Sequence, residues 1–205
     1  MINIVHLGIG NVTSIGNWAR QYTDDITLLT SPDNYTSGHL IIPGVCSSAE
    51  LAKLLKVTGF DGFLESLVGH STTKIIGVCA GFQVLGESTD EDGGAPCLGL
   101  IPVSTVSMRT LGLPSVVGWD SVRIEMPIKK ESLLRRSFPR HKALSGDAFF
   151  NHRYGVIPKT GYENPESAGK ARHCVTHWFD RNIFGLQFHP EKSSVFGRRL
   201  LGLLS

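Results

Sequence analysis

The residue best suited to chemistry in this sequence is Cys79, which lies between two glycines in the segment GVCAG. Gly77 and Gly81 stand two positions to either side, and Ala80 adds little bulk. The segment follows an apolar run and precedes an amphipathic one, which predicts a sharp turn from a strand into a helix. Such a turn can expose a nucleophile, and the N-terminus of the following helix favours a thiolate. A buried structural cysteine at a tight turn is the alternative.

A base and an acid stand near the end of the chain. The segment QFHPEKS places His189 and Glu191 just after a run that is typical of a strand. Because the carboxyl ends of parallel strands share one edge of a sheet, we expect these residues to face Cys79. His189 would then exchange protons with the thiol while Glu191 orients the imidazole. A strand-end turn with a solvated glutamate is the alternative.

A third segment, LIIPGV, could complete such a site. Pro43 and Gly44 end another expected strand. Backbone N–H groups of Gly44 or Val45, with that of Ala80, could hold the negatively charged oxygen of a tetrahedral intermediate. Proline followed by glycine is also an ordinary turn signal.

Length and composition narrow the class of protein. A chain of 205 residues with 41% hydrophobic residues predicts one domain spanning 1–205. A formal net charge of +2 argues against nucleic acid or an anionic membrane as the partner. We find no signal peptide and no apolar stretch of about 20 residues, so a cytoplasmic protein is expected. Four dispersed cysteines without CxxC spacing argue against a metal site or a disulfide framework.

The elements that position these residues can be read from the hydrophobic pattern. Strands are expected at 2–7, 26–30, 39–43, 74–79 and 182–190, and helices at 12–22, 60–68 and 193–204. This alternation predicts an α/β fold with an open, mostly parallel central sheet and flanking helices. Between 93 and 158, the strand-like segments 99–108, 121–126 and 147–156 are separated by Pro and Gly turns. That region predicts an antiparallel extension without clear helices.

Two further patterns in the sequence could indicate binding sites. The opening GIGNVT lacks the third glycine of a dinucleotide-binding fingerprint, since Thr13 stands in its place, and no cofactor is expected. The segment 129–142 carries six basic residues against Glu131, giving 6 − 1 = +5. A solvated loop is expected there, with a phosphate or nucleic-acid surface as the alternative.

The segments PGV (43–45), GVCAGFQ (77–83) and FGLQFHPEKS (184–193) together resemble the class I, or triad, glutamine amidotransferases over nearly the whole chain. The opening GIGNVTS and the lysine and serine after HPE are most similar to the glutaminase subunits of imidazole glycerol phosphate synthases. The resemblance implies a flavodoxin-like fold and hydrolysis of L-glutamine through a γ-glutamyl thioester on Cys79, with His189 moving protons and Glu191 orienting it. It also implies an oxyanion hole and glutamine contacts from Gly44, Val45, Ala80, Gln83, His152 and Tyr154.

The ammonia acceptor is expected on another chain. Only 205 − 191 = 14 residues follow Glu191, too few for a second catalytic domain. The resemblance implies a separate synthase subunit, a (β/α)₈-barrel cyclase of histidine biosynthesis that acts on a phosphorylated ribulosyl-aminoimidazole.

The chain also departs from the family pattern. Cys46 replaces a glycine and is followed by SSAE instead of an aromatic residue, Arg153 interrupts a VHSYY-like segment, and His6 replaces an acidic residue. These departures keep three alternatives open. They are a paralogue feeding a surface-polysaccharide sugar or pyridoxal phosphate synthase, a regulatory pseudo-glutaminase, and a thiol hydrolase that needs no partner.

Overall fold

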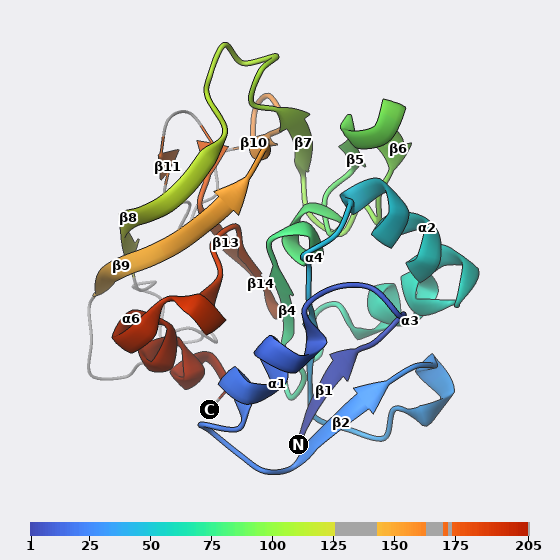
Figure 1. Ribbon diagram of the computed structural model, residues 1–205. Coiled ribbons are helices and arrows are strands. Elements are labelled where there is room, and N and C mark those ends of the chain that lie inside the picture. The colour runs from blue at the N-terminus through green and yellow to red at the C-terminus, as the bar shows by residue number, and fades with distance from the viewer. Residues whose placement is uncertain (126–142, 163–169, 172–173, 205) are drawn as a thin grey trace.

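The computed structural model describes residues 1–125, 143–162, 170–171 and 174–204. Its central feature is a six-stranded sheet with the order β13-β14-β4-β3-β1-β2 (Figure 1). Every neighbouring pair is parallel except β13 with β14, so the open, mostly parallel sheet expected from the sequence is confirmed. The strand bounds are β1 Ile2–Val5, β2 Ile26–Leu29, β3 His39–Ile42, β4 Ile75–Val78, β13 His177–Asp180 and β14 Ile183–Leu186.

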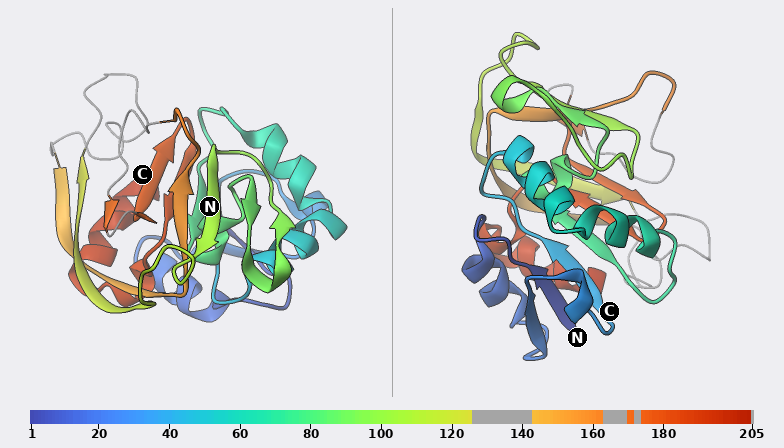
Figure 2. Two further views of the ribbon diagram at one scale, coloured as in Figure 1. Left: turned by 90° about the horizontal axis from the view of Figure 1, so that it is seen from above. Right: turned by 90° about the vertical axis from the view of Figure 1, so that its right-hand side faces the viewer.

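Helices cover both faces of this sheet (Figure 2). Trp18 of α1 (Val12–Ala19) and Phe196 of α6 (Ser194–Arg199) join one buried apolar cluster. Residues of α2 (Ser48–Val57) and α3 (Phe60–Leu67) join the other. Because both faces are covered, β1, β4 and β14 are buried at every position. This explains why β4 and β14 have no polar side chain, whereas β1 contains the buried Asn3.

The expected antiparallel extension is present beside the central sheet. The long pair β8 and β9 is antiparallel, and so is β7 with β10, whereas β5 pairs with β7 in parallel. The bounds are β5 Ser88–Thr89, β6 Ala95–Pro96, β7 Val103–Ser107, β8 Val116–Glu125, β9 Ala143–His152, β10 Tyr154–Pro158, β11 Lys170–Ala171 and β12 Cys174–Val175. Met126 and the basic segment 129–142 lie outside the described residues.

The structure differs from the sequence expectations at several elements, among them β13, which was not expected, and β8, which begins at Val116. Helix α2 was not expected, although Ser47 caps it by accepting a hydrogen bond from the Glu50 N–H. The strand expected over 147–156 is divided at Arg153 into β9 and β10. The last expected helix is α6 followed by the 3₁₀ turn Leu200–Leu204.

Short turns connect the remaining elements. Helix α4 consists of Ala80–Gln83, and 3₁₀ turns occupy Pro32–Asn34, Glu91–Gly93 and Pro190–Lys192. Within the described residues, no helix combines the length and apolar character needed to cross a membrane.

Candidate active site

Cys79 sits at a strained turn between β4 and α4. Its backbone has φ 54° and ψ −112°, a conformation rarely adopted by residues other than glycine. The neighbouring glycines allow the close packing of this turn. A Cβ atom on Gly77 would lie 2.5 Å from the Gly81 carbonyl oxygen, and one on Gly81 would overlap the Ile42 carbonyl oxygen. The sharp turn expected at GVCAG is therefore present, with the cysteine at its apex.

The Cys79 thiol is protonated at neutral pH in this structure. Burial raises its pKa to about 12, and the negative charge of Glu191 adds to that effect. The backbone N–H of Ala80 acts in the opposite direction but does not outweigh burial. The backbone at the start of α4 thus favours a thiolate, as expected, but the larger effect of burial keeps the thiol protonated.

His189 and Glu191 form a buried hydrogen-bonded pair just after β14, the strand that pairs with β4. His189 Nδ1 lies 2.9 Å from Glu191 Oε1, and each side chain is only 1% exposed. The His189 backbone is fixed by an N–H bond of 2.8 Å to the Phe149 carbonyl, and its carbonyl accepts a bond of 2.6 Å from Ser193 Oγ. Since Nδ1 is engaged by the carboxylate, Nε2 is left to exchange protons.

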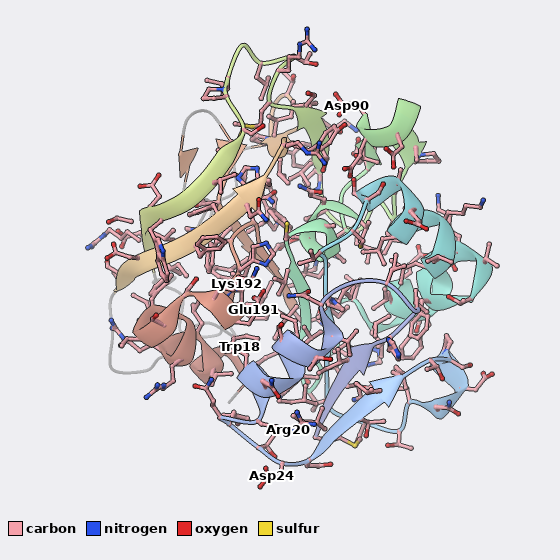
Figure 3. All side chains as sticks on the ribbon, in the orientation of Figure 1. Trp18, Arg20, Asp24, Asp90, Glu191 and Lys192 are labelled. Atoms are coloured by element: carbon pink, nitrogen blue, oxygen red, sulfur yellow. The ribbon has the colours of Figure 1, made fainter. Side chains whose placement is uncertain are left out.

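Asn11 provides a second partner for Glu191 that sequence reasoning missed. Its Nδ2 donates a hydrogen bond of 2.7 Å to Glu191 Oε1. Asn11 occupies the N-cap position of α1, yet it makes no side-chain cap bond. Glu191 lies between α1 and α6 (Figure 3), which are joined by the Trp18 Nε1 bond to the Gly197 carbonyl. The only sequence signal was an asparagine just before an expected helix.

Two buried amides adjoin the thiol. Gln83, expected to contact glutamine, donates from Nε2 to the Tyr154 carbonyl and to Gln187 Oε1, each at 3.2 Å. Gln187 in turn donates to Cys79 Sγ at 3.8 Å. Gln187 was not singled out from the sequence, although its spacing of two from His189 places both on one face of an extended segment.

His152 and Tyr154 flank the break between β9 and β10. His152 Nδ1 donates a hydrogen bond of 2.8 Å to the Tyr154 carbonyl. Burial lowers the His152 pKa, so its imidazole is neutral. Both residues line the same cavity as Cys79.

One of the backbone donors expected for an oxyanion hole, the Ala80 N–H, is not open in this structure. Gly44, Val45 and Ala80 all line the cavity. The Ala80 N–H, however, donates a hydrogen bond of 3.2 Å to the Gly44 carbonyl oxygen. A negatively charged substrate oxygen would need that carbonyl to turn away, so that an N–H of this segment faces the site instead.

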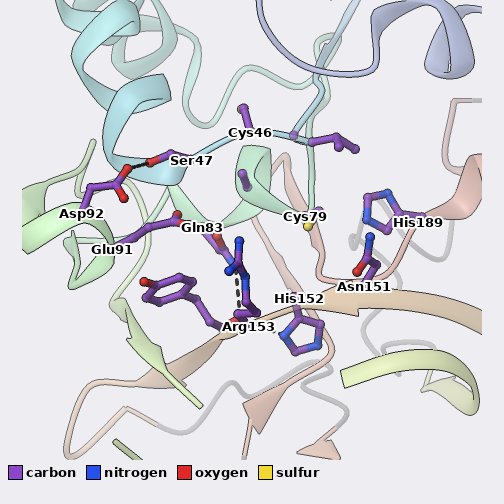
Figure 4. Close-up of a pocket in the computed structure, with 14 residues that line it drawn as sticks. Cys46, Ser47, Cys79, Gln83, Glu91, Asp92, Asn151, His152, Arg153 and His189 are labelled. Carbon is purple, nitrogen blue, oxygen red and sulfur yellow. Dashed lines mark hydrogen bonds between the residues drawn. The ribbon is translucent and has the colours of Figure 1, made fainter. Parts of the chain in front are cut away.

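These features surround one cavity of about 440 Å³ (Figure 4), a size that fits a small ligand. Every site residue predicted from the sequence lines it except Glu191, which is held behind His189. Two carboxylates that the sequence did not single out, Glu91 and Asp92, also line it. No cluster of His, Cys, Asp and Glu suited to a metal ion occurs among the described residues.

Comparison with known proteins identifies the family. Residues 17–125, more than half of the chain, match the CobB/CobQ-like glutamine amidotransferase domain. The imidazole glycerol phosphate synthase subunit HisH of Bdellovibrio bacteriovorus is 31% identical, over 98% of this chain and 97% of the relative. The chain belongs to the HisH family of glutamine amidotransferases. The HisH of Thermotoga maritima is 30% identical to this HisH-family chain, over 98% of it and 94% of the relative.

Solved structures agree with the fold of this HisH-family chain. A crystal structure of a glutamine amidotransferase superposes with a TM-score of 0.68 at 16% identity, covering 97% of this chain and 94% of the other. A glutamine amidotransferase from Thermotoga maritima superposes with a TM-score of 0.62 at 13% identity, covering 99% and 95%. The resemblance and the fold class inferred from the sequence are both confirmed.

Proposed function

We propose that this chain is the glutaminase subunit of an imidazole glycerol phosphate synthase, and that it hydrolyses L-glutamine at Cys79 for histidine biosynthesis. The observation that carries the proposal is the placement of a thiol at a strained turn and a buried imidazole–carboxylate pair at one cavity. Membership of the HisH family supports the same reaction. The expected cytoplasmic location stays a prediction.

The reaction follows from the positions of these groups. His189 takes the proton of the Cys79 thiol as sulfur attacks the side-chain amide carbon of glutamine. The carbon–nitrogen bond then breaks, and His189 returns the proton to the departing nitrogen, which leaves as ammonia. Water attacks the γ-glutamyl thioester while His189 accepts its proton. The carbon–sulfur bond then breaks to give glutamate, and His189 returns the proton to the Cys79 sulfur. Glu191 and Asn11 hold the imidazole throughout.

An exposed apolar surface beside the site is suited to the ammonia-accepting subunit. Val117, Trp119 and Val195 are 72%, 55% and 67% exposed. Trp119 packs edge-on against Phe149, with ring centroids 5.7 Å apart, and Phe149 lies 6.5 Å from the His189 ring. A partner that covers this surface would shield departing ammonia from water. We propose that the partner is a (β/α)₈-barrel cyclase.

The closed state of the oxyanion segment suggests how the partner acts. While the Gly44 carbonyl accepts the Ala80 N–H, this N–H cannot stabilise the negative charge of the tetrahedral intermediate. Docking that reorients this segment would raise the glutaminase rate, so little glutamine would be consumed without an ammonia acceptor.

Glutaminase and cyclase assays test the proposal together. The chain is mixed with a cyclase subunit, its substrate and L-glutamine, and glutamate and imidazole glycerol phosphate are measured. We expect both products in equal amounts, and neither glutamate nor cyclised product with Cys79→Ala when glutamine is the nitrogen source.

The alternatives give different results in the same assays. A paralogue would form no complex with the cyclase and would co-purify with another synthase. A pseudo-glutaminase would leave Cys79 unlabelled by a glutamine-like electrophile. A partner-independent thiol hydrolase would turn over at full rate alone. Any of these three results would reject the proposed function.

A further inference from the structure

The cavity beside Cys79 carries opposite charges on facing walls (Figure 4). Glu91 and Asp92 lie on the 3₁₀ turn that follows β5, and Arg153 lies at the junction of β9 and β10. Among the residues that the structure describes, the Arg153 guanidinium has neither an ion pair nor a hydrogen bond. A cation without a protein partner therefore faces a cavity with carboxylates on its other side.

The acidic wall is held in place by the start of α2. Glu91 Oε2 accepts hydrogen bonds of 2.7 Å from both the backbone N–H and the hydroxyl of Ser48. Asp92 Oδ2 accepts one of 2.5 Å from Ser47 Oγ. Glu91 Oε1 has no hydrogen-bond partner among the described residues, so it can accept one from a ligand. Ser47 and Ser48, the two serines of the SSAE segment that departs from the family pattern, thus hold these carboxylates at the cavity.

On the basic wall, hydrogen bonds to the backbone hold Arg153 and the residue that follows it. The Arg153 carbonyl accepts a hydrogen bond of 2.9 Å from the Met108 N–H. The next carbonyl, that of Tyr154, accepts hydrogen bonds from His152 Nδ1 and Gln83 Nε2. These bonds fix the break between the two strands, and in Figure 4 the Arg153 side chain extends from this break towards Gln83 and Glu91.

We propose that Arg153 is a specificity-determining residue that binds the α-carboxylate of free L-glutamine, while Glu91 binds its α-ammonium group. A guanidinium can pair with a carboxylate through two parallel hydrogen bonds, and Glu91 offers an open acceptor to an ammonium. The inference rests on the proposed glutaminase function and adds its substrate recognition. Amides that lack the α-carboxylate, including glutamine within a peptide, lack the group that Arg153 binds.

Covalent labelling of Cys79 tests this pairing without the partner subunit. Three probes are compared by mass spectrometry of the Cys79 peptide: the diazoketone analogue of L-glutamine, its α-methyl ester, and iodoacetamide, which has neither α-group. For Arg153→Ala, we expect the second-order labelling rate with the free diazoketone to fall about 10- to 100-fold, because one charge-assisted pair is lost. The rates with the ester and with iodoacetamide should stay within about two-fold of wild type.

Two further variants complete the design. Arg153→Lys keeps the charge without the two-pronged geometry and should recover part of the lost rate. Arg198→Ala removes an exposed arginine of α6 that does not line the cavity and should label as wild type does. The inference is overturned if Arg153→Ala labels all three probes like wild type, or slows all three equally. The labelling of wild type is repeated with the cyclase subunit present, and if the free diazoketone fails there while iodoacetamide succeeds, the glutaminase function itself fails.

Discussion

At the scale of single residues, the nucleophile of the resting site is an uncharged thiol, and a neighbouring imidazole must activate it. The thiol is buried and protonated because burial raises its pKa to about 12. The imidazole that must remove this proton is held by a carboxylate and, through it, by the amide of Asn11. Activation therefore has to coincide with substrate binding, since nothing in the resting site holds a thiolate.

The raised pKa of Cys79 predicts the pH dependence of its reactivity. Below a pKa of about 12 the thiolate fraction rises tenfold with each pH unit, so the alkylation rate should keep rising up to about pH 10. The measurement is the iodoacetamide rate at the Cys79 peptide of the folded chain, with the unfolded chain as control. In the unfolded chain the rate should level off near the ordinary thiol pKa of about 9. A plateau near pH 7 in the folded chain would instead indicate a pre-formed thiolate.

Asn11 is predicted to be a positioning residue for the imidazole–carboxylate pair. Asn11→Ala removes one of the two hydrogen bonds to Glu191 Oε1 and should lower kcat of the complex about 10-fold with little change in KM. Asn11→Asp should cost more, because it places a second carboxylate beside a buried one. Steady-state glutaminase kinetics measure both. An Asn11→Asp variant as active as wild type would show that only the space filled by the side chain matters.

The sequence could predict the triad but not all of its support. Cys79, His189 and Glu191 carry local signals, namely flanking glycines and a strand end. Asn11 and Gln187 carry only a helix-start position and a spacing of two from His189, which do not reveal their partners. Each contacts its partner across the fold, 180 and 108 positions away in the chain. Hydrogen bonds of that kind depend on the tertiary structure.

At the scale of elements, glycines set how closely β3, β4 and α4 approach. Helix α2, which was not expected, does carry a local sequence signal. Ser47 and Glu50 have the spacing of a capping box, which is typical of a helix start. The break at Arg153 carries no such signal, since the run of polar residues Asn151, His152 and Arg153 is also compatible with an unbroken strand. It is fixed instead by bonds from Met108 and Gln83, which belong to other elements.

Paired glycine substitutions test this packing. A Cβ on Gly81 would overlap the Ile42 carbonyl, so Gly81→Ala should lower the free energy of unfolding by about 1–3 kcal/mol and slow Cys79 labelling. Gly62 of α3 has open space around its Cβ position, and Gly62→Ala should raise stability by about 0.5–1 kcal/mol. Urea denaturation measures both. A Gly81→Ala chain as stable as wild type would mean that the elbow relaxes easily.

At the scale of the whole molecule, two surfaces meet at one catalytic group. His189 lines the cavity, and the exposed Trp119 surface lies one ring away from it, through Phe149, with none of Val117, Trp119 and Val195 lining the cavity. Glutamine entry and ammonia exit can therefore use different faces. A partner on the Trp119 surface need not block the entry of glutamine.

Trp119 is predicted to anchor the partner subunit. Exposed aromatic residues at interface centres often contribute 2 kcal/mol or more to binding, so Trp119→Ala should weaken the complex by a factor of about 30 or more. Tyr162→Ala is the matched control, because Tyr162 is another aromatic side chain with the same 55% exposure but lies away from this surface. Titration calorimetry against the cyclase subunit compares the two variants. If both bind the cyclase as wild type does, the docking surface lies elsewhere on the chain.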